Sequence, residues 1–113
     1  MLIINGNKVR MTRGDSVYLT VEITRTANGE QGEVYEIASD DTLTLTMRKN
    51  IRSDRIAMMK IMKGSASFRI APEDTEGLDT GCYVYDVQLR TADGDVYTVI
   101  APETWVIEGE VTR

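Results

Sequence analysis

The chain has 113 residues, a formal net charge of −5 and one cysteine, Cys82. This length suits one ordinary domain over residues 1–113, which can fold around a hydrophobic core without a disulfide or a metal ion. The acidic balance argues against a specific nucleic-acid binder, and no apolar run approaches the roughly 20 residues that a membrane-spanning helix requires.

Two short apolar runs open the chain around a turn. Leu2–Ile4 and Lys8–Met11 flank Asn5-Gly6-Asn7, whose residues tolerate the positive φ of a tight turn, so two short strands are predicted. The N-terminal segment is too short for a signal peptide, which favours synthesis and residence in a reducing cytosol. Ser16–Thr24 then alternates apolar and polar residues with a period of two, as is typical of a strand with one buried face.

The middle of the chain contains one ambiguous segment. After a polar loop at 26–32, Glu33–Ile37 predicts a weak strand and Thr42–Met47 a strong one. Ser53–Lys63 predicts either a strand or a helix capped by Ser53, because apolar residues recur in it at helical spacing. A strand is favoured, since a glycine follows and both neighbours are strands. Its methionines are expected to fill irregular core space, or alternatively to form a recognition surface.

Short strands continue to the C-terminus. Ser65–Ile70 and Cys82–Arg90 are predicted strands, and Asp93-Gly94 predicts a hairpin turn leading into Val96–Ile100. A last strand, Thr104–Val111, is predicted after Pro102. Strands spaced about 8–12 residues apart without a long helix indicate an all-β fold. We expect an immunoglobulin-like antiparallel β-sandwich of about seven to nine strands.

The most informative segment lies before the Cys82–Arg90 strand. An apolar strand ends at Pro72, an acidic turn follows, and a Gly-x-Tyr-x-Tyr strand begins at Gly81. In sandwiches this is the crossing from one sheet to the other, and a tyrosine there can donate its hydroxyl back to the crossing backbone. Tyr83 is the candidate for this tyrosine corner. Leu78 is expected to plug the core, and Gly81 to adopt a conformation that other residues resist.

Several motifs around this crossing support a family resemblance. They are Pro72-Glu73-Asp74-Thr75, Leu78, Gly81, Tyr83-Val84-Tyr85-Asp86-Val87, Asp93-Gly94 and Tyr97-Thr98-Val99-Ile100, together with Gly14-Asp15-Ser16-Val17 and Asp40-Asp41-Thr42-Leu43. The chain resembles small immunoglobulin-like phage and prophage proteins, and is similar to the N-terminal domain of phage upper baseplate proteins. The resemblance implies a virion-associated structural module, assembled in the bacterial host cytoplasm, and it supplies no catalytic residue.

Basic residues concentrate in one stretch of the acidic chain. They are Arg48, Lys49, Arg52, Arg55, Lys60 and Lys63, with Asp54 as the only acid among them. One interpretation is a strand edge or loop guarded against edge-to-edge aggregation. The other is a basic patch that meets an acidic partner. Opposite charges on one small domain would also support head-to-tail or ring assembly of the chain with itself.

The residue inventory points away from catalysis. Histidine, the commonest general base and metal ligand, is missing from the sequence, so Cys82 has no histidine to activate it. Cys82 is expected to be a buried or half-exposed residue without a chemical role. Phosphate-loop, zinc and EF-hand spacings are also missing. We therefore expect no enzyme, no cofactor and no metal site.

Two functions remain as alternatives. The first is a structural module of a bacteriophage tail or baseplate that contacts other phage structural proteins or copies of itself. The second is a host-surface or carbohydrate-binding module, which requires two or three exposed, coplanar aromatic rings. The candidates for such a platform are Tyr18, Tyr35, Tyr97 and Trp105. The simpler interpretation is that most of them serve the core or half-buried sheet faces.

Overall fold

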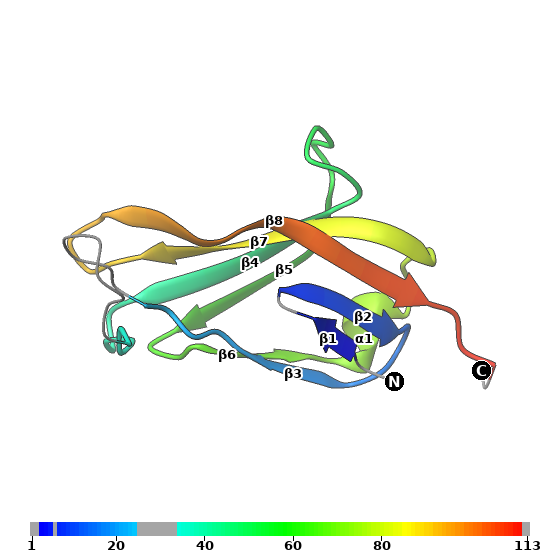
Figure 1. The fold of residues 1–113 in the computed structure, drawn as a ribbon, viewed down its shortest axis with the longest axis horizontal. Coiled ribbons are helices and arrows are strands. Elements are labelled where there is room, and N and C mark those ends of the chain that lie inside the picture. The colour runs from blue at the N-terminus through cyan, green and yellow to red at the C-terminus, as the bar shows by residue number, and fades with distance from the viewer. Residues whose placement is uncertain (1–2, 6, 25–33, 112–113) are drawn as a thin grey trace.

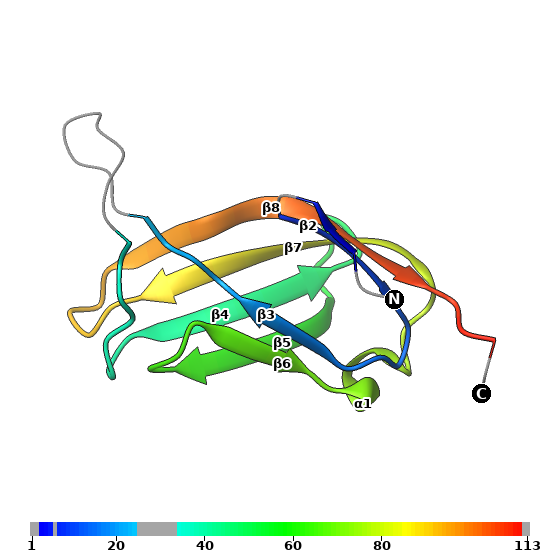
Figure 2. The same cartoon turned by 60° about the horizontal axis from the view of Figure 1, so that its bottom comes forward.

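The computed structural model describes residues 3–5, 7–24 and 34–111, and these build eight strands and one short helix (Figure 1). The elements are β1 (Ile3–Asn5), β2 (Lys8–Thr12), β3 (Val17–Thr20), β4 (Thr42–Arg48), β5 (Ile56–Lys63), β6 (Ser67–Ile70), α1 (Pro72–Thr75), β7 (Gly81–Arg90) and β8 (Val96–Glu108). Six strands form a curled sheet in the order β1-β2-β8-β7-β4-β5, and β3 pairs with β6 in a second, small sheet (Figure 2). The predicted all-β class is confirmed.

The larger sheet is mixed. β2 runs parallel to β8, with Val9 opposite Trp105 and Thr12 opposite Glu108, while every other pairing in this sheet is antiparallel. The expectation of a purely antiparallel sandwich is therefore wrong. Alternation along a strand predicts which face is buried, but it does not specify the direction of a partner from the other end of the chain.

The small sheet covers the inner face of the larger one. Val17 lies opposite Ile70 and Leu19 opposite Phe68, so the apolar sides of β3 and β6 face the core together. β3 is shorter than the predicted Ser16–Thr24, because its partner β6 has only four residues. The alternation of burial nevertheless continues through Val21, whose N–H donates to the Ala66 carbonyl at 2.8 Å.

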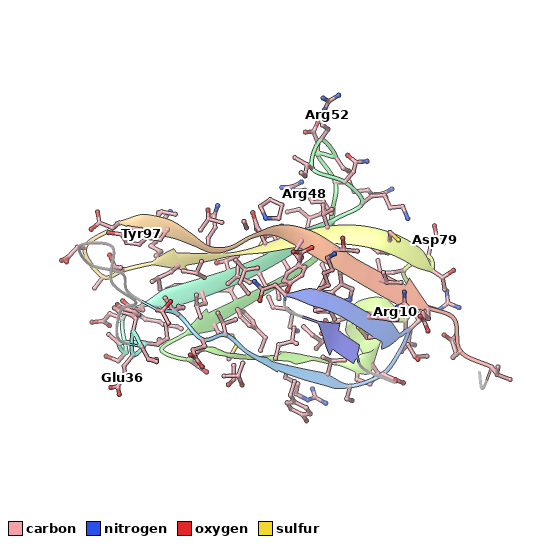
Figure 3. All side chains as sticks on the ribbon, in the orientation of Figure 1. Arg10, Glu36, Arg48, Arg52, Asp79 and Tyr97 are labelled. Carbon is pink, nitrogen blue, oxygen red and sulfur yellow. The ribbon has the colours of Figure 1, made fainter. Side chains whose placement is uncertain are left out.

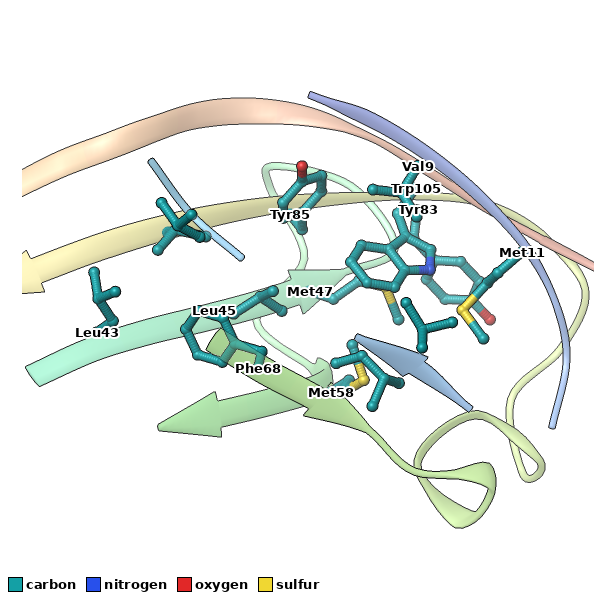
Figure 4. Packing of buried hydrophobic residues seen from close by; sticks show 14 of the residues in the cluster. Val9, Met11, Leu43, Leu45, Met47, Met58, Phe68, Tyr83, Tyr85 and Trp105 are labelled. Atoms are coloured by element: carbon teal, nitrogen blue, oxygen red, sulfur yellow. The ribbon is translucent and has the colours of Figure 1, made fainter. Parts of the chain in front are cut away.

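A cluster of buried side chains lies between the two sheets (Figure 4). Trp105 is 0% exposed and meets the ring of Tyr85 edge to face, with centroids 5.1 Å apart. The Tyr85 hydroxyl donates to the carbonyl of Asn7, which ties the β1–β2 turn to β7. Burial raises the pKa of Tyr85 to about 12, so this hydroxyl stays protonated and able to donate.

The ambiguous segment Ser53–Lys63 forms a strand over Ile56–Lys63, and the helical alternative is wrong. β5 pairs antiparallel with β4, with Leu43 opposite Met62 and Met47 opposite Met58. The neighbouring strand supplies a full set of backbone partners, which outweighs the helical spacing of a few apolar residues.

The weak strand predicted at Glu33–Ile37 does not form over its described residues. It reduces to an isolated bridge between Thr24 and Val34, while Glu33 and the loop at 26–32 lie outside the described residues. Tyr35 holds this part of the chain instead, because its hydroxyl donates to Asp41 at 2.6 Å. This side-chain bond and one backbone bond, from the Tyr35 N–H to the Ile23 carbonyl at 2.7 Å, thus replace a longer strand ladder.

The C-terminal part of the chain forms one long strand rather than the two predicted around Pro102. Tyr85 lies opposite Glu103 and Val87 opposite Ile100, so the register shifts and Pro102 falls in an irregularity between these pairs. A proline is tolerated there because its missing N–H removes no regular ladder bond. The predicted hairpin turn connects β7 to β8, with Gly94 at a φ of 89°.

Candidate interaction surface

The crossing between the sheets is closed by Tyr83. Its hydroxyl donates to the carbonyl of Asp79 at 2.6 Å, which is the geometry expected of a tyrosine corner. Gly81 has a φ of 137°, a region that L side chains rarely adopt, and Leu78 is half-buried against the core. The three residues singled out in the sequence thus meet at one corner of the molecule.

Two contacts that the sequence did not reveal reinforce this corner. Arg13 donates to the Leu78 carbonyl and to both carboxylate oxygens of Glu110, each at 3.1 Å. Gly14 N–H donates to the buried hydroxyl of Thr75 at 2.8 Å. These bonds join the β2–β3 turn, the crossing and the chain after β8. Their partners lie 61 to 97 residues apart, so no local pattern signals them.

The six basic residues of the predicted patch do not share one environment. Lys49, Arg52 and Arg55 are exposed in the β4–β5 hairpin, which projects from the body with Arg52 at its tip (Figure 3). Arg48 lies at the hairpin base and donates to the Ser53 carbonyl at 3.1 Å. The Lys49 ammonium lies 4.5 Å from the centre of the Tyr83 ring. Lys63 lies opposite Thr42, at the other end of β5.

Lys60 is paired inside the molecule. Its Nζ donates to Asp74 Oδ2 at 2.8 Å, and the same oxygen accepts the Ala71 N–H at 2.7 Å at the start of α1. Burial works against the charged carboxyl, but the bonds from Lys60 and Ala71 together lower the pKa of Asp74 below its ordinary value. Lys60 therefore fastens β5 to α1 and does not form part of an exposed patch.

A groove of about 350 Å³ runs between the edges of β5 and β6. Met59 and Ile61 of β5 line it and are 44% and 60% exposed. On the side of the small sheet, Tyr18 and Arg69 line it, with the Arg69 Nε donating to the Tyr18 hydroxyl at 3.3 Å. The methionines divide between two roles, because Met58 is buried in the core while Met59 faces this groove.

A second, larger hollow of about 660 Å³ lies beside the β7–β8 hairpin, where Tyr97 also lies (Figure 3). Asp41 lies on its wall, buried, and accepts from the Tyr35 hydroxyl and from the Ala38 N–H at 2.9 Å. These two bonds lower the pKa of Asp41, which therefore stays charged. The carboxylate organises its own loop, so we assign it a structural role.

The aromatic residues proposed for a sugar platform are scattered. Trp105 is in the core, and Tyr35 is half-buried against it. Of the exposed rings, Tyr18 lines the groove at β5 and β6 whereas Tyr97, 54% exposed, lines the hollow at the β7–β8 hairpin. The four candidates therefore do not form one flat surface.

Cys82 is exposed, contrary to the expectation of a buried or half-exposed side chain. It lies on the outer side of β7, out of phase with the core-facing Tyr83 and Tyr85. Within residues 3–5, 7–24 and 34–111, no group of three acidic or cysteine side chains is placed to hold a metal ion. Nor does the described part of the chain contain a helix long and apolar enough to cross a membrane.

No protein-family model matches the chain, and no curated protein matches it in sequence.

Proposed function

We propose that the fold is an immunoglobulin-like sandwich of the variable type. The consecutive strands β8-β7-β4-β5 correspond in order to strands G, F, C and C′, and the pair β3-β6 corresponds to B and E. The Tyr83 hydroxyl bond near the start of β7 supports this assignment, because strand F of such domains carries the tyrosine corner.

On this fold, the protein acts as a non-enzymatic structural module of a bacteriophage or prophage tail or baseplate. It is assembled in the host cytoplasm and works through protein–protein contacts. The observation that carries the proposal is the pair of neighbouring strand edges, β5 and β6, each hydrogen-bonded to a described strand on one side only. A groove with exposed Met59 and Ile61 lies between them. Open edges with apolar side chains are typical of surfaces that bind another chain. The resemblance of the sequence motifs to those of phage upper baseplate proteins supports this class of assembly.

Mass spectrometry of purified phage particles tests the proposal. After prophage induction in the bacterial strain that encodes the protein, the chain should be present in the particles at a fixed ratio to the major tail protein. A cytosolic protein of similar abundance from the same cells controls for carry-over. Particles that contain the tail proteins but lack this chain would overturn the assignment.

A further inference from the structure

Two surfaces of opposite charge lie at the two ends of β4. Asp41, just before this strand, is on the wall of the hollow beside the β7–β8 hairpin, and Lys49, just after it, begins the β4–β5 hairpin. The seven residues of β4 span about 20 Å as extended chain. Figure 3 shows Arg52 at the tip of the projecting β4–β5 hairpin, well away from Tyr97 beside the hollow. The hairpin therefore cannot enter the hollow of its own chain.

The β4–β5 hairpin presents an apolar side chain beside positive charges. The Ser53 N–H donates to the Asn50 carbonyl at 3.1 Å, so Ile51 and Arg52 are the two central residues of the turn. The Asn50 side chain accepts the Arg52 N–H at 3.0 Å, which orders the turn before any partner binds. Ile51 is 71% exposed. Arg52 and Arg55 are exposed too, and neither forms an ion pair with a described residue.

The hollow of about 660 Å³ carries the opposite charge. Glu22, Asp93 and Asp95 line it and are exposed, and none of these carboxylates forms an ion pair within the described part of the chain. The buried carboxylate of Asp41 adds a fourth negative charge, while no lysine or arginine is among the described residues that line the hollow. The exposed ring of Tyr97 supplies an apolar surface beside these acids.

The basic residues at this end of the sheet point away from the hollow. Lys63 and Arg90 lie on either side of Thr42, on the strands that flank β4. They follow Met62 and Leu89, which face the core, so they project from the outer face of the sheet. Leu89 itself lines the hollow, which therefore opens from the inner side. The acids of the hollow are thus left without a basic neighbour from these two strands.

The two surfaces fit each other better than either fits itself. Residues 49–55 contain three basic residues and one acid. Two hairpins or two hollows in contact would bring like charges together, whereas a hairpin in a hollow brings opposite charges together. Sites of roughly 300–1,000 Å³ enclose small-molecule ligands, so the hollow has room for the side chains of a turn. Because every copy carries both surfaces, the chain itself supplies the matching partner.

We propose that copies of this chain associate head to tail, with the β4–β5 hairpin of one copy in the hollow beside the β7–β8 hairpin of the next. This inference rests on the proposed structural function and names a partner, a second copy. Ile51 packs beside Tyr97, and the arginines of the hairpin approach the aspartates of the hollow. Each copy offers one hairpin and one hollow, so the contact closes into a ring or continues as a filament.

Sedimentation velocity of the full chain, over a range of protein concentrations, tests this contact. We expect the wild-type species to grow in size as the concentration rises. The hairpin variant, Arg52→Glu with Arg55→Glu, presents acids to an acidic hollow and should weaken association about tenfold or more. The hollow variant, Asp93→Lys with Asp95→Lys, presents a basic hollow to a basic hairpin and should weaken association to a similar degree.

A mixture of these two variants distinguishes this contact from a general effect of charge. The acidic hairpin of the first fits the basic hollow of the second, and the two unchanged surfaces also fit each other. Association should therefore return in the mixture. Glu73→Lys with Glu76→Lys makes the same charge change as the hollow variant at exposed residues beside α1, and should leave association unchanged. Circular dichroism verifies that all variants are folded.

Several outcomes would overturn the inference. These are a wild-type chain that stays monomeric at about 1 mM, a hairpin variant that associates as the wild type does, or a mixture that does not associate. Binding of a monomeric chain to phosphatidylglycerol vesicles, lost in the hairpin variant, would assign the hairpin to an anionic membrane surface instead.

The proposed function fails separately, because it depends on whether the chain is present in phage particles. A chain that is present there but stays monomeric in solution would keep its function and lose this partner. A chain that associates head to tail but is missing from the particles would keep this contact and lose the function.

Discussion

Tyr83 is held from two sides at the crossing between the sheets. Its hydroxyl is bound to the Asp79 carbonyl, and its ring lies under the Lys49 ammonium. Burial is the main reason that its pKa is raised, so the hydroxyl remains a donor at neutral pH. The corner is therefore fixed by a bond to a residue only four positions earlier in the chain. Such a local bond is why sequence alone could point to this tyrosine.

Removal of this hydroxyl should destabilise the fold. In Tyr83→Phe, the Asp79 carbonyl loses its donor, and we expect the free energy of unfolding to fall by about 1 kcal/mol or somewhat more. Urea unfolding followed by circular dichroism measures the change. Tyr97→Phe is the control, since Tyr97 is exposed and its change should stay within about 0.5 kcal/mol. An unchanged urea midpoint for Tyr83→Phe would show that this hydroxyl bond does not stabilise the crossing.

At the scale of elements, the start of β7 depends on one glycine. Gly81 has a φ of 137°, and a Cβ built there would lie 3.2 Å from Lys49 Nζ. The lysine can move, but the backbone strain would remain, so Gly81→Ala should lower the free energy of unfolding by about 1 kcal/mol or more. Thermal unfolding detects this as a lower midpoint.

Gly77→Ala is the matched control four residues earlier. A Cβ at Gly77 would meet nothing within 4 Å, and its φ is outside the left-handed region. The substitution should leave stability unchanged or raise it slightly, because alanine reduces the freedom of the unfolded chain. If both variants were equally stable, backbone strain would not explain the choice of glycine at position 81.

Strands and turns could be predicted where the sequence pattern that specifies them is local. Alternation located β4 and β7 almost to the residue, and Asp93-Gly94 located the turn between β7 and β8. The parallel neighbour of β2 and the irregularity that accommodates Pro102 depend on partners distant in the chain, so no window of sequence contains them.

The candidate interaction surface also depends on partners that are distant in the chain. Six basic residues are close in sequence, but successive residues of a strand point to opposite faces. Lys60 therefore faces the small sheet and meets Asp74, a contact that depends on where α1 packs. The groove between β5 and β6 was not predicted, because it requires knowing that both strands are edges.

For the whole molecule, acidic pH should lower the free energy of unfolding. Asp41 and Asp74 have folded pKa values below the ordinary value of about 3.9, so their carboxylates stabilise the fold above that pH. This stabilisation is lost as the pH falls through their lower folded values. Asp86 works in the opposite direction, because burial raises its pKa.

Urea midpoints measured from pH 6 down to pH 2 test this balance. The wild-type midpoint should fall most steeply below about pH 4. Asp41→Asn removes one of the two carboxyls whose pKa is lowered and should flatten the fall. Asp93→Asn, the same substitution at the exposed β7–β8 hairpin, controls for the removal of one negative charge. A wild-type midpoint that rises on acidification would show that Asp86 outweighs the other two.

The only tryptophan of the chain lies where its two ends meet. Trp105 is buried in β8, where it lies opposite Val9 of β2 on one side and opposite Tyr83 of β7 on the other. Its ring packs against that of Tyr85. Its intrinsic fluorescence therefore comes from a single position at the seam between the first and last parts of the sheet. Loss of β2 from β8 would expose the indole to water and shift its emission to the red. Detachment of the N-terminal strands could thus be followed separately from the circular dichroism of the whole sheet, without any added label.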